Sequence, residues 1–391
     1  MGQGLIAGQV ALSLLLLFAA SLLVRSLQKL LTQDFGYARD RLVIACLDPT
    51  SAGYNSETMK ALAQKLVAGL ASTPGVHAVT YSTNGLFADT ELKNTILVPG
   101  FSARREDRSA REDYVGPDYF RAVGIPILAG RGIERQDTAT STRVAVVNPA
   151  MVKHFFPGQD PIGRQFRIDD ERWLDKPITI IGVSHDAKDH GGGLREGVEP
   201  RFYMAFQQVP DPIQIILEVQ VAGLASAAVS NVVSQIKAVD PNVPLSFSET
   251  LDTLVNDSAA NQIALAKLAV FFAGLALLLA CVGLYGVMSY TVAGRTREIG
   301  VRMALGAARG DVMQLVLREG MLLVTTGLVI GIPLSLASSR LLQGFLFGLK
   351  ATDPSSLITI ILLLGMVAAL AAFVPAPRAA KVDPIVALRS E

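Results

Sequence analysis

The sequence predicts an α-helical membrane protein with four transmembrane helices and a large α+β domain outside the membrane, which combines a split α/β part with a mainly β insertion. Three observations support this fold class. Hydrophobic residues make up 50% of the 391-residue chain and charged residues only 18%, whereas charged residues account for about 25% of ordinary soluble domains. Four apolar runs approach the roughly 20 residues that a membrane-spanning helix needs. A long polar segment separates the first run from the second.

The apolar runs are the predicted spans, and they set the domain boundaries. They cover residues 5–24, 268–292, 321–342 and 357–374. We therefore expect a first transmembrane helix over residues 1–30, an external domain over residues 36–260 and a second membrane domain with three transmembrane helices over residues 262–391.

The first apolar run has a second interpretation as a cleaved secretory signal, because Ala19, Ala20 and Ser21 form a cluster of small residues. A signal usually begins with basic residues and has a shorter apolar region. No Lys or Arg precedes this run. We expect an uncleaved span.

Basic residues near the span ends predict the orientation, since Lys and Arg accumulate on the cytoplasmic side. The connection after the second span carries five Arg, the tail at residues 375–391 carries three basic residues, and the third connection carries only Lys350. Both termini are therefore predicted to be cytoplasmic and residues 36–260 external. Arg25 and Lys29 oppose this rule locally, because they follow the first span on its outer side.

The external segment shows the same pattern at both of its ends. Its first part, residues 40–97, reads as a strand at 41–47, a helix at 55–71 and a strand at 76–82. Its last part, residues 210–255, reads as a strand at 213–221, a helix at 224–239 and a strand at 243–248. Two such units predict one split α/β domain whose strands come together around an insertion.

The insertion, residues 98–205, has a different composition. Short strand-like runs at residues 144–147 and 178–183 alternate with Gly and Pro turns, which is typical of a small, mainly β subdomain. The three glycines at residues 191–193 predict a loop rather than a phosphate cradle, because no helix follows a strand there.

A basic amphipathic segment at residues 294–319 lies between the second and third spans. Its position predicts a cytoplasmic helix that packs against another surface through an apolar stripe. The stripe consists of Ile299, Met303, Val312, Leu315 and Val316.

Small residues within two spans are candidate helix-packing positions. Gly283 and Gly286 lie in the second span, and Gly327 and Gly331 form a small-xxx-small pair in the third. Small residues let helix backbones approach closely in membranes.

Catalytic and metal-binding motifs do not stand out. The chain lacks the Gly-rich ATP-binding loop and the Gly-x-Ser-x-Gly elbow. His185 and His190 lie in a polar external loop rather than one helical turn apart, so we expect no metal. Cys46 and Cys281 lie in different domains, so we expect no disulfide between them. The net charge of +1 argues against a nucleic-acid partner.

Several stretches resemble one known family. Residues 283–292 read Gly-Leu-Tyr-Gly-Val-Met-Ser-Tyr-Thr-Val, residues 297–307 read Arg-Glu-Ile-Gly-Val-Arg-Met-Ala-Leu-Gly-Ala, and the tail at 378–389 reads Arg-Ala-Ala-Lys-Val-Asp-Pro-Ile-Val-Ala-Leu-Arg. Externally, residues 119–126 read Tyr-Phe-Arg-Ala-Val-Gly-Ile-Pro and residues 155–163 read Phe-Phe-Pro-Gly-Gln-Asp-Pro-Ile-Gly. The chain resembles the MacB/FtsX-like permeases of ABC transporters, with a MacB-like periplasmic core domain and an FtsX-like C-terminal permease domain.

The resemblance implies a non-enzymatic permease subunit in the bacterial inner membrane. It implies a second permease copy or half as partner and a separate ABC ATPase on the cytoplasmic face, and it is compatible with membrane lipid and a periplasmic adaptor as further partners. ATP hydrolysis would move the spans and the periplasmic domain to expel substrate. No cofactor is implied. The implied ATPase-coupling residues are Arg295, Arg297, Glu298, Ile299, Gly300, Arg302, Leu305, Gly306 and Arg309.

The departures from the family pattern leave alternatives open. The family usually has a basic segment before the first span, whereas here only Met1-Gly-Gln-Gly stands before it. In the tail, Pro377 stands where the family commonly has Arg. The chain resembles the second half of a duplicated permease, so a fragment, a split gene and a half that pairs with another permease stay open. A cell-division-type scaffold acting on a periplasmic partner and an orphan half without transport are the alternative functions. The large two-part external domain favours export.

Overall fold

The computed structural model describes residues 2–37, 39–88, 92–102, 104–173, 176–189, 194, 197–294, 309–341, 343, 346–348 and 353–373. The chain forms two compact units. We call residues 1–32 and 261–391 the membrane unit and residues 33–260 the external unit, after their predicted locations. Each unit is described by itself below.

The membrane unit consists of apolar helices. They are α1 (Gly2–Leu31), α7 (Ala260–Gly294), α9 (Arg309–Ser339) and α10 (Pro354–Phe373). Among the described residues, three helices are long and apolar enough to cross a membrane: Gly4–Leu31, Ala260–Thr291 and Gly320–Ser339. In α10 the apolar stretch that qualifies, Pro354–Val367, is shorter. Four spans therefore remain a prediction, whereas all four predicted apolar runs form helices.

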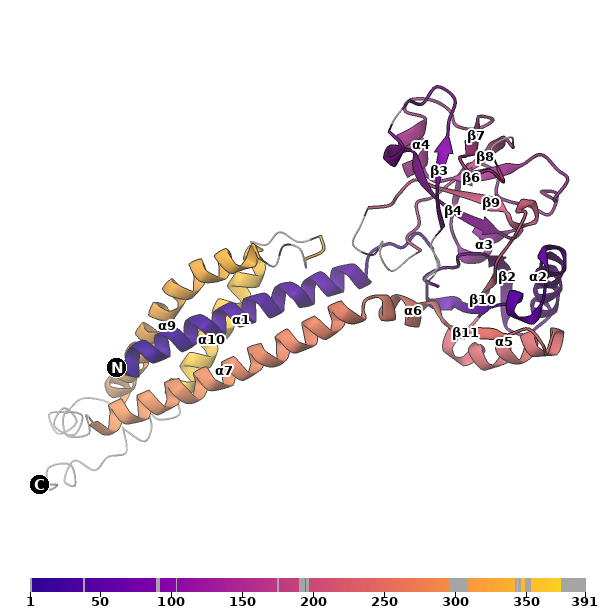
Figure 1. The fold of residues 1–391 in the computed structure, drawn as a ribbon. Coiled ribbons are helices and arrows are strands. Elements are labelled where there is room, and N and C mark those ends of the chain that lie inside the picture. The colour runs from indigo at the N-terminus through magenta and orange to yellow at the C-terminus, as the bar shows by residue number, and fades with distance from the viewer. Residues whose placement is uncertain are drawn as a thin grey trace, which may run out of the picture. The chain divides into compact units, whose positions relative to one another are not determined.

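Helix α1 is the element around which the membrane unit packs (Figure 1). Its N-terminal half contacts α7 and α9 through Ile6 and Val10, which cluster with Leu284, Met288 and Val324. Its C-terminal half contacts α10 through an apolar cluster that contains Leu14, Phe18, Leu22, Ile360 and Leu364. The hydroxyl of Ser13 donates to the backbone oxygen of Ala276 in α7 at 2.9 Å.

The α/β part of the external unit consists of two interlocked βαβ units. Its elements are β1 (Leu42–Leu47), α2 (Ser56–Ala71), β2 (Val76–Ser82), β10 (Ile215–Val221), α5 (Ala225–Val239) and β11 (Leu245–Thr250). The strand order is β11-β1-β10-β2. All three pairings are antiparallel. Each unit thus places one strand between the two parallel strands of the other, so the first and last parts of the segment share one sheet.

Local sequence explains these helices. Asn55 accepts a hydrogen bond from the backbone of Thr58, and the Thr58 side chain accepts one from the backbone of Asn55, which together cap α2. The face of α2 that carries Met59, Leu62 and Leu66 is buried in the main core. Helix α5 adds Val232 and Ile236 to the same core, which therefore lies between the two helices and one face of the sheet.

The insertion is mainly β, as predicted, and its strands close into a ring. Strand β4 pairs with β3 and with β9, and the remaining pairings run β3-β7-β8-β6-β9. A closed ring has no unpaired strand edge. The strands are β3 (Leu92–Leu97), β4 (Ser109–Val115), β6 (Val144–Val147), β7 (Gln165–Ile168), β8 (Ile178–Ser184) and β9 (Arg201–Ala205), with β5 (Ile127–Gly130) paired to β8.

Short helices complete the external unit. They are α3 (Tyr119–Val123), α4 (Pro149–Phe155) and α6 (Leu251–Ser258), with 3₁₀ turns at Arg39–Arg41, Thr50–Ala52, Glu106–Arg108 and Phe206–Gln208. One predicted boundary differs from the pairing. Strand β3 lies within the predicted α/β part, residues 40–97, but it pairs with β4 and β7 of the ring. The ring therefore begins at Leu92 rather than at residue 98.

Candidate coupling and helix-packing sites

The predicted coupling segment lies mostly outside the described residues. Residues 295–308, which include eight of the nine predicted coupling positions, are not described. The ninth, Arg309, is the first residue of α9, and Gly294 is the last residue of α7. The coupling role therefore stays a prediction from the sequence.

Gly327 and Gly331 lie where α9 approaches α1. A Cβ atom added at Gly327 would lie 2.7 Å from Cβ of Val10 and 2.9 Å from the backbone oxygen of Ala7. One added at Gly331 would lie 3.0 Å from Cα of Ala11. The neighbours are backbone or branched side chains that cannot move away easily, so both positions are tight.

The two candidate glycines of α7 have looser surroundings. A Cβ atom at Gly283 would lie 2.5 Å from Oε1 of Gln9, which is the end of a flexible side chain. A Cβ atom at Gly286 would meet no atom within 4 Å. Within this chain, close approach therefore concerns α9 more than α7.

A polar cluster at the C-terminal end of α1 was not predicted. The Arg25 guanidinium pairs with Asp353 and donates to the hydroxyls of Ser355 and Ser356, at 2.6 Å and 2.9 Å. Nearby, Lys29 Nζ donates to the backbone oxygen of Gly348 at 2.5 Å. The two basic residues that oppose the charge rule therefore bind the chain between α9 and α10. Their position just outside the first span, where the charge rule expects few basic residues, was the sequence feature that could have indicated this cluster.

A second unpredicted cluster lies in the external unit, next to the start of α7. Arg39 pairs with Asp252 of α6 at 2.7 Å and donates to Asn256 Oδ1 at 3.2 Å. Leu251 and Val255 of the same helix are fully buried. Helix α6 follows β11 directly and ends two residues before α7 begins. The sheet and the membrane helix are therefore joined by a short, anchored segment.

The external unit also buries two acids that carry no full ion pair. Glu218 of β10 points to the sheet face opposite α2 and α5, is fully buried and accepts from the Ser82 hydroxyl. Burial raises the pKa of Glu218 well above its usual value. Burial also raises the pKa of Asp113 to about 6, although the backbone nitrogens of Asn84 and Tyr114 donate to it. The Arg201 guanidinium lowers the pKa of Asp113 in part, but Arg201 pairs with Asp189.

These raised pKa values predict that the external unit loses stability as the pH rises. An acid whose pKa is higher in the folded than in the unfolded state favours folding most when it is protonated, below about pH 4. The advantage falls as the pH rises through the folded pKa, about 6 for Asp113. At pH 7.5 we expect Asp113→Asn and Glu218→Gln to unfold at a higher temperature than the wild type. For Asp113→Asn the gain in unfolding free energy is about 2–3 kcal/mol. At pH 4 all three proteins should unfold at the same temperature.

Fluorescence of Trp173 can follow this unfolding. It is the chain's single tryptophan, is buried in the external unit and stacks on Tyr114. Glu199→Gln is the control, because burial raises the pKa of Glu199 but Lys93 and Arg111 together lower it below its usual value. This substitution should therefore lower the unfolding temperature at pH 7.5, the opposite of the change expected for the two buried acids. If the unfolding temperatures of the wild type, Asp113→Asn and Glu218→Gln changed with pH in the same way, the assignment would be contradicted.

Within the described residues, no group of three His, Cys, Asp or Glu side chains is arranged to hold a metal. His185 Nδ1 lies 2.8 Å from the backbone oxygen of Asp186. His190 and the glycines at residues 191–193 lie outside the described part of the chain. Cys46 and Cys281 are both free.

Family profiles cover most of the chain. Residues 5–239 match the profile described as MacB-like periplasmic core domain. Residues 270–384 match the profile described as FtsX-like permease C-terminal. The first match alone covers more than half of the chain, and the second match begins after the first one ends.

Curated relatives are ATP-binding and permease fusions. The chain is 30% identical over 287 residues to the macrolide export ATP-binding/permease protein MacB of Hahella chejuensis, covering 71% of this chain and 42% of that protein. It is 28% identical over 294 residues to a probable syringafactin export ATP-binding/permease protein of Pseudomonas syringae pv. tomato, covering 73% of this chain and 43% of that protein. The chain thus spans less than half of the length of the curated relatives it matches.

A solved structure is similar as well. The periplasmic region of MacB from Actinobacillus actinomycetemcomitans matches with a TM-score of 0.41 and 17% identity, over 59% of this chain and 97% of that chain. The family assignment depends on the sequence profiles. The chain belongs to the MacB/FtsX-like family of ABC transporter permeases, which are inner-membrane proteins.

Proposed function

We propose that the chain is the permease subunit of an ABC-type exporter of the mechanotransmission class. A separate ATPase would bind the cytoplasmic segment at residues 294–319, and its closure would move the helices and the periplasmic domain to expel substrate. The observation that carries the proposal is that one chain holds a MacB-like periplasmic core domain and an FtsX-like permease domain in order. The relatives named for macrolide and syringafactin export support efflux.

The anchored segment before α7 supports mechanical transmission. A movement along α7 would reach β11 through α6, whose apolar face is buried and whose polar face pairs with Arg39. Eight helical residues with two fully buried side chains resist extension better than a flexible linker. In this proposal, a shift of α7 is transmitted along the chain through α6 instead of a long loop.

The proposal includes four spans, cytoplasmic termini and a second permease copy or half. The pairing of Arg25 with Asp353 supports the topology, because it places the C-terminal end of α1 beside the N-terminal end of α10. Both ends are external in the predicted orientation. A periplasmic adaptor and bound lipid are compatible further partners.

Co-purification tests the permease assignment. The detergent-solubilised chain is used to pull down the ABC ATPase encoded next to it, in the presence and absence of ATP. We expect a stable complex with the wild type. Failure to retain any such ATPase would contradict the permease assignment and favour a scaffold or an orphan half.

A further inference from the structure

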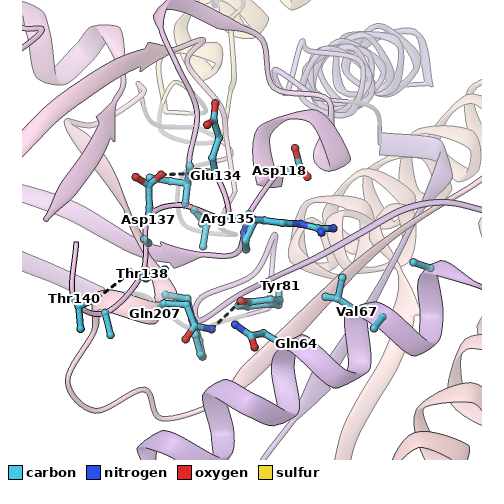
Figure 2. Close-up of a pocket in the computed structure, with 18 residues that line it drawn as sticks. Gln64, Val67, Tyr81, Asp118, Glu134, Arg135, Asp137, Thr138, Thr140 and Gln207 are labelled. Carbon is cyan, nitrogen blue, oxygen red and sulfur yellow. Dashed lines mark hydrogen bonds between the residues drawn. The ribbon is translucent and has the colours of Figure 1, made fainter. Parts of the chain in front are cut away.

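The external unit contains a cavity that none of the assignments above explains. Its volume is about 640 Å³, within the range of about 300–1,000 Å³ that is typical of small-molecule sites. Helix α2 contributes one wall, and the chain after β4, the loop at residues 133–140 and the chain after β9 contribute the others. The cavity therefore lies between the α/β part and the β ring (Figure 2).

The floor of the cavity is apolar. Val67, Ala68 and Ala71 of α2 line it on one side, and Tyr81 and Phe206 line it on the other. The rings of Tyr81 and Phe206 pack edge to face at 5.0 Å, and both side chains are almost fully buried. The Tyr81 hydroxyl accepts a hydrogen bond from Gln207 at 3.2 Å, so it is satisfied by the protein itself. The floor suits a hydrocarbon group better than a polar one.

The rim is held in place before any ligand arrives. Asp137 is buried and forms a two-point ion pair with Arg131, at 2.7 Å and 2.8 Å. The same carboxylate accepts from the backbone of Glu134 at 2.9 Å. Asp118 has a φ of +60°, and its backbone nitrogen donates to Ile133 at 3.0 Å. Aspartate tolerates this left-handed conformation better than most residues.

Two of the three acids on the rim lie within 4 Å of an arginine and the third contacts a neutral amide, and Arg135 is a further cation on this rim. Asp137 pairs with Arg131, Asp118 lies 3.4 Å from Arg121, and Glu134 accepts from Gln136 at 2.8 Å. Arg135 has no acidic group within 4 Å in the described part of the chain.

Arg135 is placed to meet a ligand above the apolar floor. Figure 2 shows its side chain extending between Asp118 and Tyr81, whereas the Glu134 carboxylate points away from Tyr81 and Val67. A guanidinium presents a planar set of donors that matches a carboxylate. The geometry points to a binding site for an amphipathic carboxylic acid, whose apolar chain lies on the floor and whose carboxylate meets Arg135.

Binding can be measured without an ATPase or transport, so the inference does not rest on the proposed function. The full chain in lipid nanodiscs is dialysed against radiolabelled octanoate, with empty nanodiscs subtracted. Octylammonium and octanol have the same chain and a different head group. We expect saturable octanoate binding that is at least tenfold tighter than binding of either analogue, because only octanoate can pair with Arg135.

Two variants separate the head-group and chain contacts. Arg135→Gln is expected to weaken octanoate binding about tenfold, as for a lost charge-assisted hydrogen bond. Ala68→Trp places a large ring in the cavity from an exposed helix position and is expected to abolish binding. The controls are Arg167→Gln and Ala61→Trp, which change exposed residues outside the cavity and should bind like the wild type.

Three outcomes would overturn the inference. Octanoate could fail to bind the wild type, octylammonium could bind more tightly than octanoate, or octanoate could bind Arg135→Gln or Ala68→Trp as tightly as the wild type. The wild-type arm alone decides the first two. Size-exclusion chromatography and circular dichroism of each variant establish that a loss of binding does not reflect unfolding.

Discussion

Reversing one charge in the coupling segment, by Arg297→Glu or Glu298→Arg, is expected to abolish stimulation of the partner ATPase by the permease. In the proposed arrangement the segment lays an apolar stripe in a groove of the ATPase while its charged residues meet complementary groups at the rim. A reversed charge at such a rim replaces an attraction by a repulsion, which can cost several kcal/mol. ATP hydrolysis by the mixed subunits, measured in nanodiscs, should fall to the rate of the ATPase alone.

Membrane insertion of these variants should be unchanged, because the altered residues lie between spans. Arg340→Glu is the matched control, since it reverses the charge of an exposed arginine just after the other end of α9. Its ATPase stimulation should equal that of the wild type. Wild-type stimulation by Arg297→Glu and Glu298→Arg would show that the coupling residues are assigned to the wrong segment.

Replacing Gly327 of α9 by Leu is expected to destabilise the membrane unit by about 1–3 kcal/mol, the usual cost of overpacking. The first added atom already meets Val10 and the backbone of Ala7 closer than contact distance. Helix α1 would have to move away from α9 along much of their shared surface. Titration of the purified chain with sodium dodecyl sulfate, followed by circular dichroism, measures the loss.

Gly286→Leu is the control for this variant, because it makes the same substitution in an apolar helix at a position with no neighbour within 4 Å. Its unfolding in dodecyl sulfate should match that of the wild type. Equal destabilisation by the two substitutions would mean that helix propensity or lipid contacts, rather than packing of α9 on α1, determine the effect. A loss in Gly286→Leu alone would contradict the prediction, because Gly327 is the tightly packed position.

The spacing of apolar residues within each segment was enough to predict most elements of the α/β part. The strands and helices of the α/β part follow the period-two and helical spacing of their own residues, so β1, α2, β2 and α5 lie close to their predicted ranges. The structure shows Asn55 as the residue that caps the start of α2. The repeated pattern predicted one split domain, but the interlocked order β11-β1-β10-β2 depends on pairing between distant strands that the pattern does not specify.

The closed β ring could not be predicted in the same way. Its closure depends on pairing between Arg111–Val115 and Arg201–Ala205, which are far apart in sequence and carry no local signal for each other. The boundary of the ring at Leu92 has the same origin. Glu218 and Asp113 also escaped prediction, since charged residues in a strand normally mark its solvent-facing side.

The candidate site was predictable only in outline. Glycine spacing identified Gly327 and Gly331, but it did not distinguish them from Gly286, because the approach of α1 is set by three-dimensional packing. Arg25 was noticed as an exception to the charge rule, while its partner Asp353 lies 328 positions away. The cavity beside Arg135 had no signal in the sequence, since its lining comes from five separate segments.

The most direct test of the account is whether ATP moves the external unit relative to the membrane unit. Lys65 of α2 and Arg340 after α9 are exposed and can be replaced by cysteines for spin labels in a Cys281→Ala background, in which Cys46 stays buried. Pulsed electron paramagnetic resonance then compares the complex without nucleotide and with ATP and vanadate. The account predicts a shifted distance distribution that disappears in Arg297→Glu. An unchanged distribution in a complex that hydrolyses ATP at the stimulated rate would contradict it.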